Sequence, residues 1–230
     1  MISWRGCLKG ASSFLYKTMT QRERLLSLPD EDFIRYEEDE LYGYKSSSGE
    51  ILIPARFSHA PERASERMEV WIKGKCGYIN KVAEEIMPII YDDLIGYCYE
   101  THPDVEMYLA EKDGKFGLFD NDFNELIPMM YDDLALVHPV NPTPARLGDK
   151  WGYINCRNDV VIDFKFEDAD IFIEDVAYVK IGNKYGYINI RGDIVIPPKF
   201  DDASAFHEGI AMVMQDDKEF YIDKMGNVIE

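Results

Sequence analysis

The feature that most constrains this chain is a unit of roughly 34 residues that recurs along most of its length. The words KYGYINIRGDIVIPPKFDDA, which begin at Lys184, return with changes at Leu41, Lys75, Lys115 and Lys150, and a shortened copy begins at Lys218. The motif glycine falls at Gly43, Gly77, Gly117, Gly152 and Gly186, and Phe220 takes its place in the last copy. A fixed period of this length is typical of repeat proteins whose units stack on one another.

Two further landmarks keep their place within each unit. A proline follows the glycine at Pro54, Pro88, Pro128 and Pro197, with Asp163 as the exception. An aromatic residue comes three positions later, at Phe57, Tyr91, Tyr131, Phe166 and Phe200. The alternating GYIN stretch, a polar turn and a second apolar run predict two strands, and a third strand such as 209–214 leads to the next unit. We expect the proline to end the pairing of the second strand, because proline has no amide hydrogen to donate.

Three short strands cannot bury one face of a sheet alone, so neighbouring units must stack and share a core. The sequence therefore predicts an all-β fold, in which tandem three-stranded antiparallel units form a solenoid-like array. A propeller-like closure is the alternative, and it would need residues 33–36 to complete the last copy. The motif aromatics are expected to form the core between units rather than a ligand site.

The first 32 residues differ in character from the rest. Residues 1–29 carry five basic residues and Glu23 as the one acidic residue. Residues 19–29 predict a short helix, with Thr20 as N-cap, Glu23 completing a capping box and Pro29 ending it. We therefore divide the chain into residues 1–32, a basic arm or helical cap, and residues 33–230, a repeat domain with units starting near 41, 75, 115, 150, 184 and 218.

Charge and cysteine content narrow the possible partners. Asp and Glu number 43 against 25 Lys and Arg, which gives a net charge of −18. Such a field repels phosphate backbones and anionic lipids, so we expect neither nucleic acid nor membrane insertion. No stretch approaches the roughly 18 apolar residues of a membrane span, no signal peptide is evident, and the four cysteines form no CxxC pair. The expected location is the cytoplasm.

The motif K-(aromatic)-G-Y-I-(N/D), followed by V/I-rich residues, proline and (F/Y)-D-D-A, resembles the WG repeat family, also called KWG repeats, found mostly in bacteria. Only Trp151-Gly152 is a literal WG pair, and Cys76 replaces the aromatic residue in the second copy, which removes most of its stacking surface. The resemblance implies a β-rich interaction module without shared catalytic residues. It also implies a possible link to secreted bacterial toxins, beside which some such proteins look like immunity proteins.

The repeated acid pairs are the first candidates for chemistry: Asp92-Asp93, Asp132-Asp133, Glu167-Asp168 and Asp201-Asp202. Paired carboxylates can bind a hard cation or serve acid–base catalysis. A group that recurs in every unit after a strand is better explained as a turn whose carboxylate accepts backbone amide hydrogens. No catalytic motif is present, so we predict no enzyme activity, no metal site and no cofactor.

Two irregular segments are better candidates for binding. About six extra residues lie between Asp93 and Met107, and the segment VHPVNPTP at 137–144 replaces the usual start of a third strand. In repeat arrays such departures form loops on one face, which is often the binding face. The predicted partner-binding residues are Tyr97, Tyr99, Glu100, His102, Asp104, His138 and Asn141, together with Asp92, Asp93, Asp132 and Asp133.

These observations favour a non-enzymatic, acidic protein-binding module with a basic protein partner. Its most specific form is an immunity-like protein that neutralises a basic bacterial toxin. The alternative is an envelope-associated protein that binds a glycan or a cation through its repeated aromatics and acids, which would require exposed aromatic rings. An enzyme with its site in the irregular loops is the weakest hypothesis.

Overall fold

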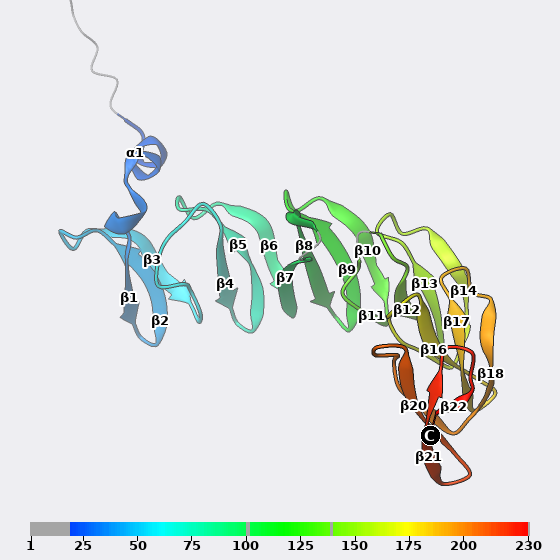
Figure 1. Ribbon diagram of the computed structural model, residues 1–230. Helices are drawn as coiled ribbons and strands as arrows, with labels where there is room; N and C mark the ends of the chain where they lie inside the picture. Colours follow the sequence, from blue (N-terminus) through cyan, green and yellow to red (C-terminus); the bar gives the residue numbers. More distant parts are fainter. Residues whose placement is uncertain (1–18, 100–101, 139, 230) are drawn as a thin grey trace, which may run out of the picture.

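The chain folds as a row of six antiparallel β-sheets that bends towards its C-terminal end (Figure 1). The computed structural model describes residues 19–99, 102–138 and 140–229, and for residue 99 and residues 102–105 it describes the backbone alone. Helix α1 (Gln21–Ser27) is followed by the short 3-10 turn η1 (Asp30–Asp32). All other elements of the described chain are strands, which confirms the predicted all-β class.

The first three sheets contain three, three and four strands. Sheet 1 consists of β1 (Ile34–Glu38), β2 (Leu41–Lys45) and β3 (Ile51–Phe57). Sheet 2 consists of β4 (Met68–Ile72), β5 (Lys75–Ile79) and β6 (Glu85–Tyr91). Sheet 3 consists of β7 (Asp93–Tyr99), β8 (His102–Lys112), β9 (Lys115–Asp120) and β10 (Glu125–Tyr131).

The last three sheets have four strands each, and the first strand is only two residues long. Sheet 4 consists of β11 (Asp133–Leu134), β12 (Thr143–Leu147), β13 (Lys150–Ile154) and β14 (Val160–Phe166). Sheet 5 consists of β15 (Asp168–Ala169), β16 (Val176–Ile181), β17 (Lys184–Asn189) and β18 (Ile194–Phe200). Sheet 6 consists of β19 (Asp202–Ala203), β20 (Ile210–Gln215), β21 (Lys218–Asp223) and β22 (Val228–Ile229).

The sheets are out of phase with the sequence units. The third strand of each unit pairs with the first strand of the next unit, as β16 does with β17 from Val176↔Asn189 to Ile181↔Lys184. The reason is the tight turn between them, where Gly182 and Asn183 have positive φ angles of 58° and 66°, because two-residue hairpins of this kind join adjacent antiparallel strands. Each sheet therefore joins strands of two consecutive repeats.

The motif glycine is explained by a bulge in the neighbouring strand. Between the pairs Tyr185↔Phe200 and Tyr187↔Ile196, β17 advances two residues and β18 advances four. The bulge presses the backbone of β18 against Gly186, where a Cβ would lie 2.6 Å from the Ile196 carbonyl oxygen. Pro197 lies inside this bulge, and β18 continues to Phe200. The expectation that proline ends the pairing was wrong, because a bulge leaves its residue without a ladder hydrogen bond to lose.

The hydrophobic core lies between successive sheets. Between sheets 5 and 6, Tyr187, Ile196 and Phe200 pack against Phe206 and Val213. The Tyr187 and Phe206 ring centroids are 4.8 Å apart. The aromatic residues that end the outer strands are all buried, namely Phe57, Tyr91, Tyr131, Phe166 and Phe200. The prediction that motif aromatics form the core between units is confirmed for these five, and the aromatics beside the motif glycine, Phe116, Trp151 and Tyr185, are partly buried against the same clusters.

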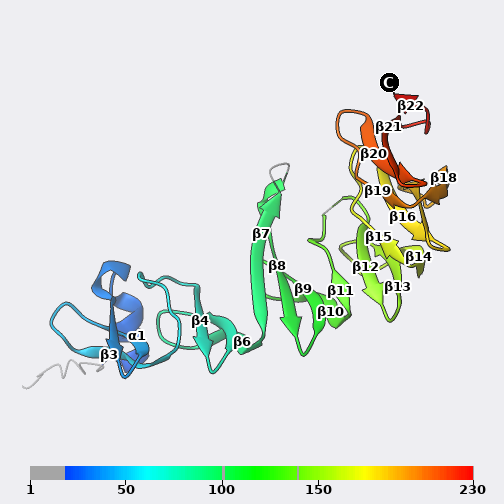
Figure 2. The same cartoon turned by 90° about the horizontal axis from the view of Figure 1, so that it is seen from below.

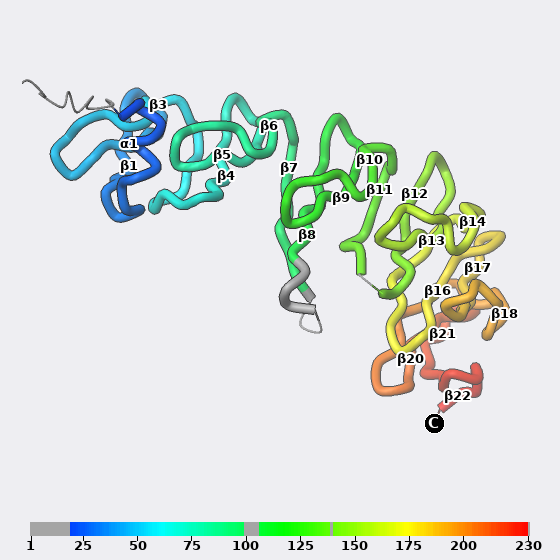
Figure 3. The backbone as a smooth tube through the Cα atoms, turned by 90° about the horizontal axis from the view of Figure 1, so that it is seen from above, coloured from blue at the N-terminus to red at the C-terminus, as the bar shows by residue number. Residues whose placement is uncertain are grey.

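The row is open. Helix α1 and strand β22 lie at its opposite ends in both projections (Figure 1, Figure 3). Residues 34–38, which a closed ring would need at the last copy, form β1 and pair with β2 instead. The last sheet is completed by its own β22, which pairs with β21. The structure thus corresponds to the predicted solenoid-like array and not to the propeller-like alternative.

The predicted N-terminal helix is present. Thr20 accepts a hydrogen bond from the Glu23 amide and the Glu23 side chain accepts one from the Thr20 amide, which completes the capping box. Leu25 is buried with Leu52 and Ile53 of β3. The helix lies over the turns of the first two sheets, where it is fixed to sheet 2 by the ion pair between Arg22 and Glu84.

Candidate protein-interaction surface

The first acid of each repeated pair bonds the lysine that opens its own motif copy. These lysines lie at the first position of β5, β9, β13 and β17, and each acid follows 17 residues later. The pairs are Lys75–Asp92 (2.5 Å), Lys115–Asp132 (2.5 Å), Lys150–Glu167 (3.0 Å) and Lys184–Asp201. Sequence reasoning missed this partner, although a lysine opens four of the five complete copies.

The same carboxylate also bonds the following sheet. Its second oxygen accepts an amide hydrogen from the next hairpin turn, donated by Asp113 to Asp92 (2.7 Å), Gly148 to Asp132 (2.8 Å), Gly182 to Glu167 (3.2 Å) and Asp216 to Asp201 (2.9 Å). Each first acid therefore bridges two consecutive sheets. The lysine hydrogen bond, followed by the backbone hydrogen bond, lowers the pKa of Asp92, Asp132 and Asp201. These contacts match the turn role expected for the acid pairs.

The second acid of each pair begins the inner strand of the next sheet. Asp93, Asp168 and Asp202 each accept the amide hydrogen of the residue that follows, at 2.9–3.0 Å. Asp133 begins β11, and its carboxylate lies 3.9 Å from the Arg146 guanidinium. The predicted acid residues are therefore divided between a bridging role and a strand-opening role.

A buried tyrosine fastens three of the junctions. Tyr44, Tyr153 and Tyr187 donate their hydroxyl hydrogen to the carbonyl oxygen of the residue 17 positions later, at 2.6, 2.8 and 2.9 Å. Burial raises the pKa of these hydroxyls, to about 12 for Tyr44. In sheet 3 the same position is Leu118, which has no hydroxyl to donate.

At this junction Tyr97 of β7 holds the loop instead. Its hydroxyl donates to the Val137 carbonyl oxygen (3.2 Å) and accepts from the Val137 amide (2.9 Å). The two irregular segments that the sequence singled out, 40 residues apart, are therefore neighbours. Tyr97 is half-buried and serves to join them.

The extra residues of the second unit, which begins at Lys75, extend a hairpin of sheet 3 rather than forming a loop. β7 and β8 pair in unbroken register from Asp93↔Glu111 to Tyr97↔Met107. The hairpin stands out from the row beside the other sheets (Figure 2). In the other four-stranded sheets the equivalent inner strand has two residues, so the insertion creates an element that the regular unit lacks.

The neighbouring loop 135–142 is organised by His138. Its Nδ1 atom accepts the amide hydrogens of Val140 (3.1 Å) and Asn141 (2.9 Å), and its own amide donates to the Thr143 hydroxyl (3.0 Å). An imidazole that accepts at Nδ1 carries its hydrogen at Nε2. His138 thus shapes the loop, while Asn141 is exposed.

Apolar side chains are exposed on both segments. Ile95 of β7 is 45% exposed and Val140 of the loop is 69% exposed, and Leu136 is exposed as well. We define the hairpin–loop surface as Asp93–Tyr97 of β7 together with Leu136, Val140 and Asn141. Of the predicted binding residues, Glu100 lies outside the described residues, as do the side chains of Tyr99, His102 and Asp104, so those predictions stay predictions.

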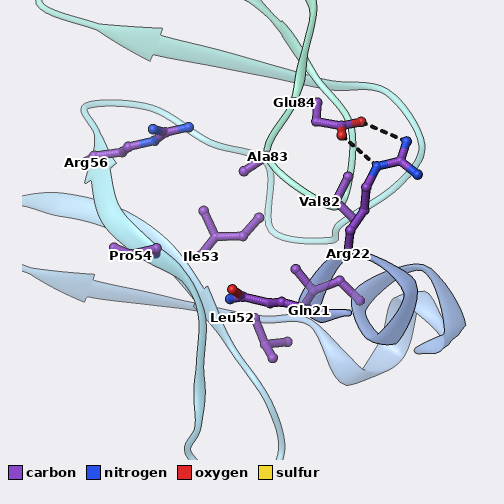
Figure 4. Close-up of a pocket in the computed structure, with 10 residues that line it drawn as sticks. Gln21, Arg22, Leu52, Ile53, Pro54, Arg56, Val82, Ala83 and Glu84 are labelled. Atoms are coloured by element: carbon purple, nitrogen blue, oxygen red, sulfur yellow. Dashed lines mark hydrogen bonds and ion pairs between the residues drawn. The ribbon is translucent and has the colours of Figure 1, made fainter. Parts of the chain in front are cut away.

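A separate pocket of about 340 Å³ opens between α1, β3 and residues 82–84 (Figure 4). Two nitrogen atoms of Arg22 bond the two carboxylate oxygens of Glu84, at 2.7 and 3.2 Å. These hydrogen bonds, with a further one from Asn80, lower the pKa of Glu84 to about 2. Glu84 thus joins the helix to sheet 2 and is poorly suited to accept a proton.

A buried lysine next to this pocket was not anticipated from the sequence. Lys81 donates to the Leu28 carbonyl oxygen (3.3 Å) and lies 3.2 Å from Glu66 and 3.6 Å from Asp30. It is only 8% exposed. Because a buried ammonium requires such partners, Lys81 fixes the segment after α1 to the second sheet.

In the part of the chain that the structure describes, no three His, Cys, Asp or Glu side chains come together as a metal site would require. Over the same residues, no helix has the length and apolar character that crossing a bilayer requires.

A family model described as the WG containing repeat matches residues 151–185 and 185–218, which cover β13 through β20. These residues are similar to the WG containing repeat. The match confirms the resemblance inferred from the motif, and the WG glycine is the one that the outer-strand bulge demands. A comparison with curated proteins found no match.

The solved structures that match this chain are distant from it. They include Hsv2 of Kluyveromyces lactis (11% identity, 72% of this chain and 60% of that chain, TM-score 0.45) and Sqt1 of Saccharomyces cerevisiae (10%, 88% and 71%, 0.42). A protein of unknown function from Bacteroides caccae also matches (8%, 72% and 78%, 0.33). The chain spans 60% of the length of Hsv2.

Proposed function

We propose that this protein is a non-catalytic binding module that holds a basic partner protein on the hairpin–loop surface. The observation that carries this proposal is the Tyr97–Val137 contact, which brings the two irregular segments of the array together. Regular repeats do not need such a contact, because their own motif tyrosine fastens the junction. Exposed apolar side chains on both segments, such as Ile95 and Val140, are what a protein interface uses at its centre.

The charge of the hairpin favours a basic partner. Between Asp93 and Lys112 the sequence contains five acidic residues against one lysine and no arginine. Opposite charge steers association and suppresses wrong partners. The alternative of a glycan or cation ligand has less support, because the repeated aromatics pack between sheets and each first acid already bonds a lysine.

Affinity capture with matched variants tests the proposal. Val140→Lys introduces a cation into the surface, and Val228→Lys makes the same change on sheet 6, where Val228 is 63% exposed. We expect the wild type and Val228→Lys to retain the same basic proteins from the source cells, with release at high salt, and Val140→Lys to lose them. If Val140→Lys retains the same proteins, or the retained proteins are not basic, the proposal fails.

The most specific form of this proposal is an immunity-like role in the cytoplasm, where the module masks the active site of a basic toxin. A retained protein would then be toxic when expressed alone. Co-expression of the wild type should restore growth, and co-expression of Val140→Lys should not. A retained partner without toxicity would remove the immunity role and leave the binding module.

A further inference from the structure

The inner edge of sheet 3 differs from the inner edges of the other four-stranded sheets, because β7 has seven residues where β11, β15 and β19 have two. β7 pairs with β8 and, among the described strands, with no other. In antiparallel strands alternate residues turn their N–H and C=O groups to opposite sides, so alternate residues of 93–96 turn backbone groups to the far side, where the Leu94 amide bonds the Asp93 carboxylate and not another strand. Ile95 and Gly96 on this stretch are exposed.

Natural proteins protect such edges, and most other edges here are protected. The inner strands β11, β15 and β19 have only two residues. Four of the outer strands, β3, β6, β10 and β18, contain proline within their bulge, and both devices prevent further pairing. The sequence DLIGY of β7 has no proline and pairs in regular register. An edge left open in this way can accept another strand.

The charges beside this edge are unbalanced in a way that is not repeated elsewhere. In sheets 4 and 5 the inner acid lies opposite a basic residue, Asp133↔Arg146 and Asp168↔Lys180. In sheet 3 Asp93 lies opposite Glu111. Within the described chain no basic side chain forms an ion pair with either of them. Like charges directly opposite each other destabilise a strand pair, so a cation arriving at this edge would relieve the repulsion.

We infer that β7 is a docking edge for an extended, lysine- or arginine-bearing strand of a partner protein, which adds to sheet 3 as a fifth strand. The added backbone would bond the outward-facing groups of 93–96, and its basic side chains would lie beside Asp93 and Glu111. Strand addition obtains affinity from main-chain hydrogen bonds and specificity from alternate side chains. This inference rests on the proposed function and specifies how the partner binds.

A synthetic strand serves as the probe. Fluorescein-labelled KTKVKTKV is compared with KTKPKPKV, which has the same charge but lacks two backbone donors, and with the acidic ETEVETEV. We expect the first peptide to bind with a rise in fluorescence anisotropy, the proline peptide to bind about tenfold more weakly or worse, and the acidic peptide not to bind. Hydrogen exchange of the amides in 94–96 that face away from β8 should slow when KTKVKTKV is bound.

The variant Glu111→Lys supplies the opposing cation that sheets 4 and 5 already have. It should raise the melting temperature and weaken KTKVKTKV binding severalfold, so a loss of binding cannot be attributed to unfolding. Met214→Lys, at the matching position opposite Asp202 in sheet 6, should leave binding unchanged. Equal affinity for KTKVKTKV and KTKPKPKV would overturn strand addition while leaving the acidic binding surface in place. Absence of binding by either peptide would also overturn it, and the capture experiment with Val140→Lys judges the proposed function separately.

Discussion

Single residues in this repeat are dictated by what lies opposite them on the next strand. The glycine is required because a bulge in the outer strand brings backbone atoms within 2.4–2.8 Å of where a Cβ would be, in all five complete copies. The last copy can carry Phe220 because β22 is two residues long and pairs with β21 without a bulge. The glycine of the five complete copies and its replacement by Phe220 in the last copy therefore have one cause, which is whether the neighbouring outer strand has a bulge.

Gly186→Ala is predicted to destabilise the protein by about 2–3 kcal/mol, since its Cβ would force the β18 backbone away. Gly182→Ala is the matched control. Its backbone is left-handed but nothing lies within 4 Å of the new atom, so only the conformational cost of about 1 kcal/mol applies. Urea unfolding of both variants makes the comparison. A Gly186→Ala variant as stable as Gly182→Ala would show that the close approach does not constrain this position.

The sequence shows that the motif glycine recurs. It does not reveal why glycine is needed there, because the bulge that presses against it depends on the pairing between strands. Cys76 illustrates a similar limit. The predicted loss of stacking surface overlooked Trp71, which lies directly opposite Cys76 on β4 and packs in the same cluster. The large ring is found on the partner strand, a position that only the register reveals.

At the scale of elements, the bridging carboxylates connect sheets that have separate hydrogen-bond ladders. The turn role of the acid pairs was predictable, because a group repeated after each strand is seldom catalytic. The hairpin was predicted as a loop. The six inserted residues instead lengthen two strands, since added residues on both sides of a turn can continue an existing ladder. The contact between this hairpin and Val137 depends on how the sheets stack. The sequence therefore predicted only that the two irregular segments lie on one face, and not that Tyr97 bonds Val137.

Asp201→Asn is predicted to lower the melting temperature at pH 7, because it removes the ion pair with Lys184. The folded-state pKa of Asp201 lies below its ordinary value, so its contribution is complete above about pH 4, the unfolded value, and is lost as pH falls through the folded value. The gap between wild type and variant should therefore close in acid. Asp202 forms no ion pair in the described chain, and an asparagine oxygen can still accept the Ala203 amide hydrogen. Asp202→Asn should therefore show a smaller gap, measured by thermal melts from pH 7 to pH 2.5. A gap that is constant over this range would contradict the bridging role.

At the scale of the whole molecule, the open row follows from how its two ends are built. The first sheet uses residues 34–38 for its own edge, and the last sheet ends in a face that no sheet of the described chain covers. Tyr221 at this face is 56% exposed, whereas the equivalent Tyr187 is fully buried. The period alone left open whether the row closes, since similar repeats suit rings and solenoids. Whether the row closes depends on whether residues 34–38 pair with β2 or with the last copy. Pairing with the last copy would be a contact between distant parts of the chain, which the period does not reveal.

Small-angle X-ray scattering tests the open stacked row most directly. A compact chain of 230 residues would have a radius of gyration of about 17 Å. The account predicts a clearly larger radius, with a distance distribution that is skewed and has a long tail. A radius near about 17 Å with a symmetric distribution would mean that the sheets close on themselves, and the open edge of β7 would then need to be reconsidered along with the fold.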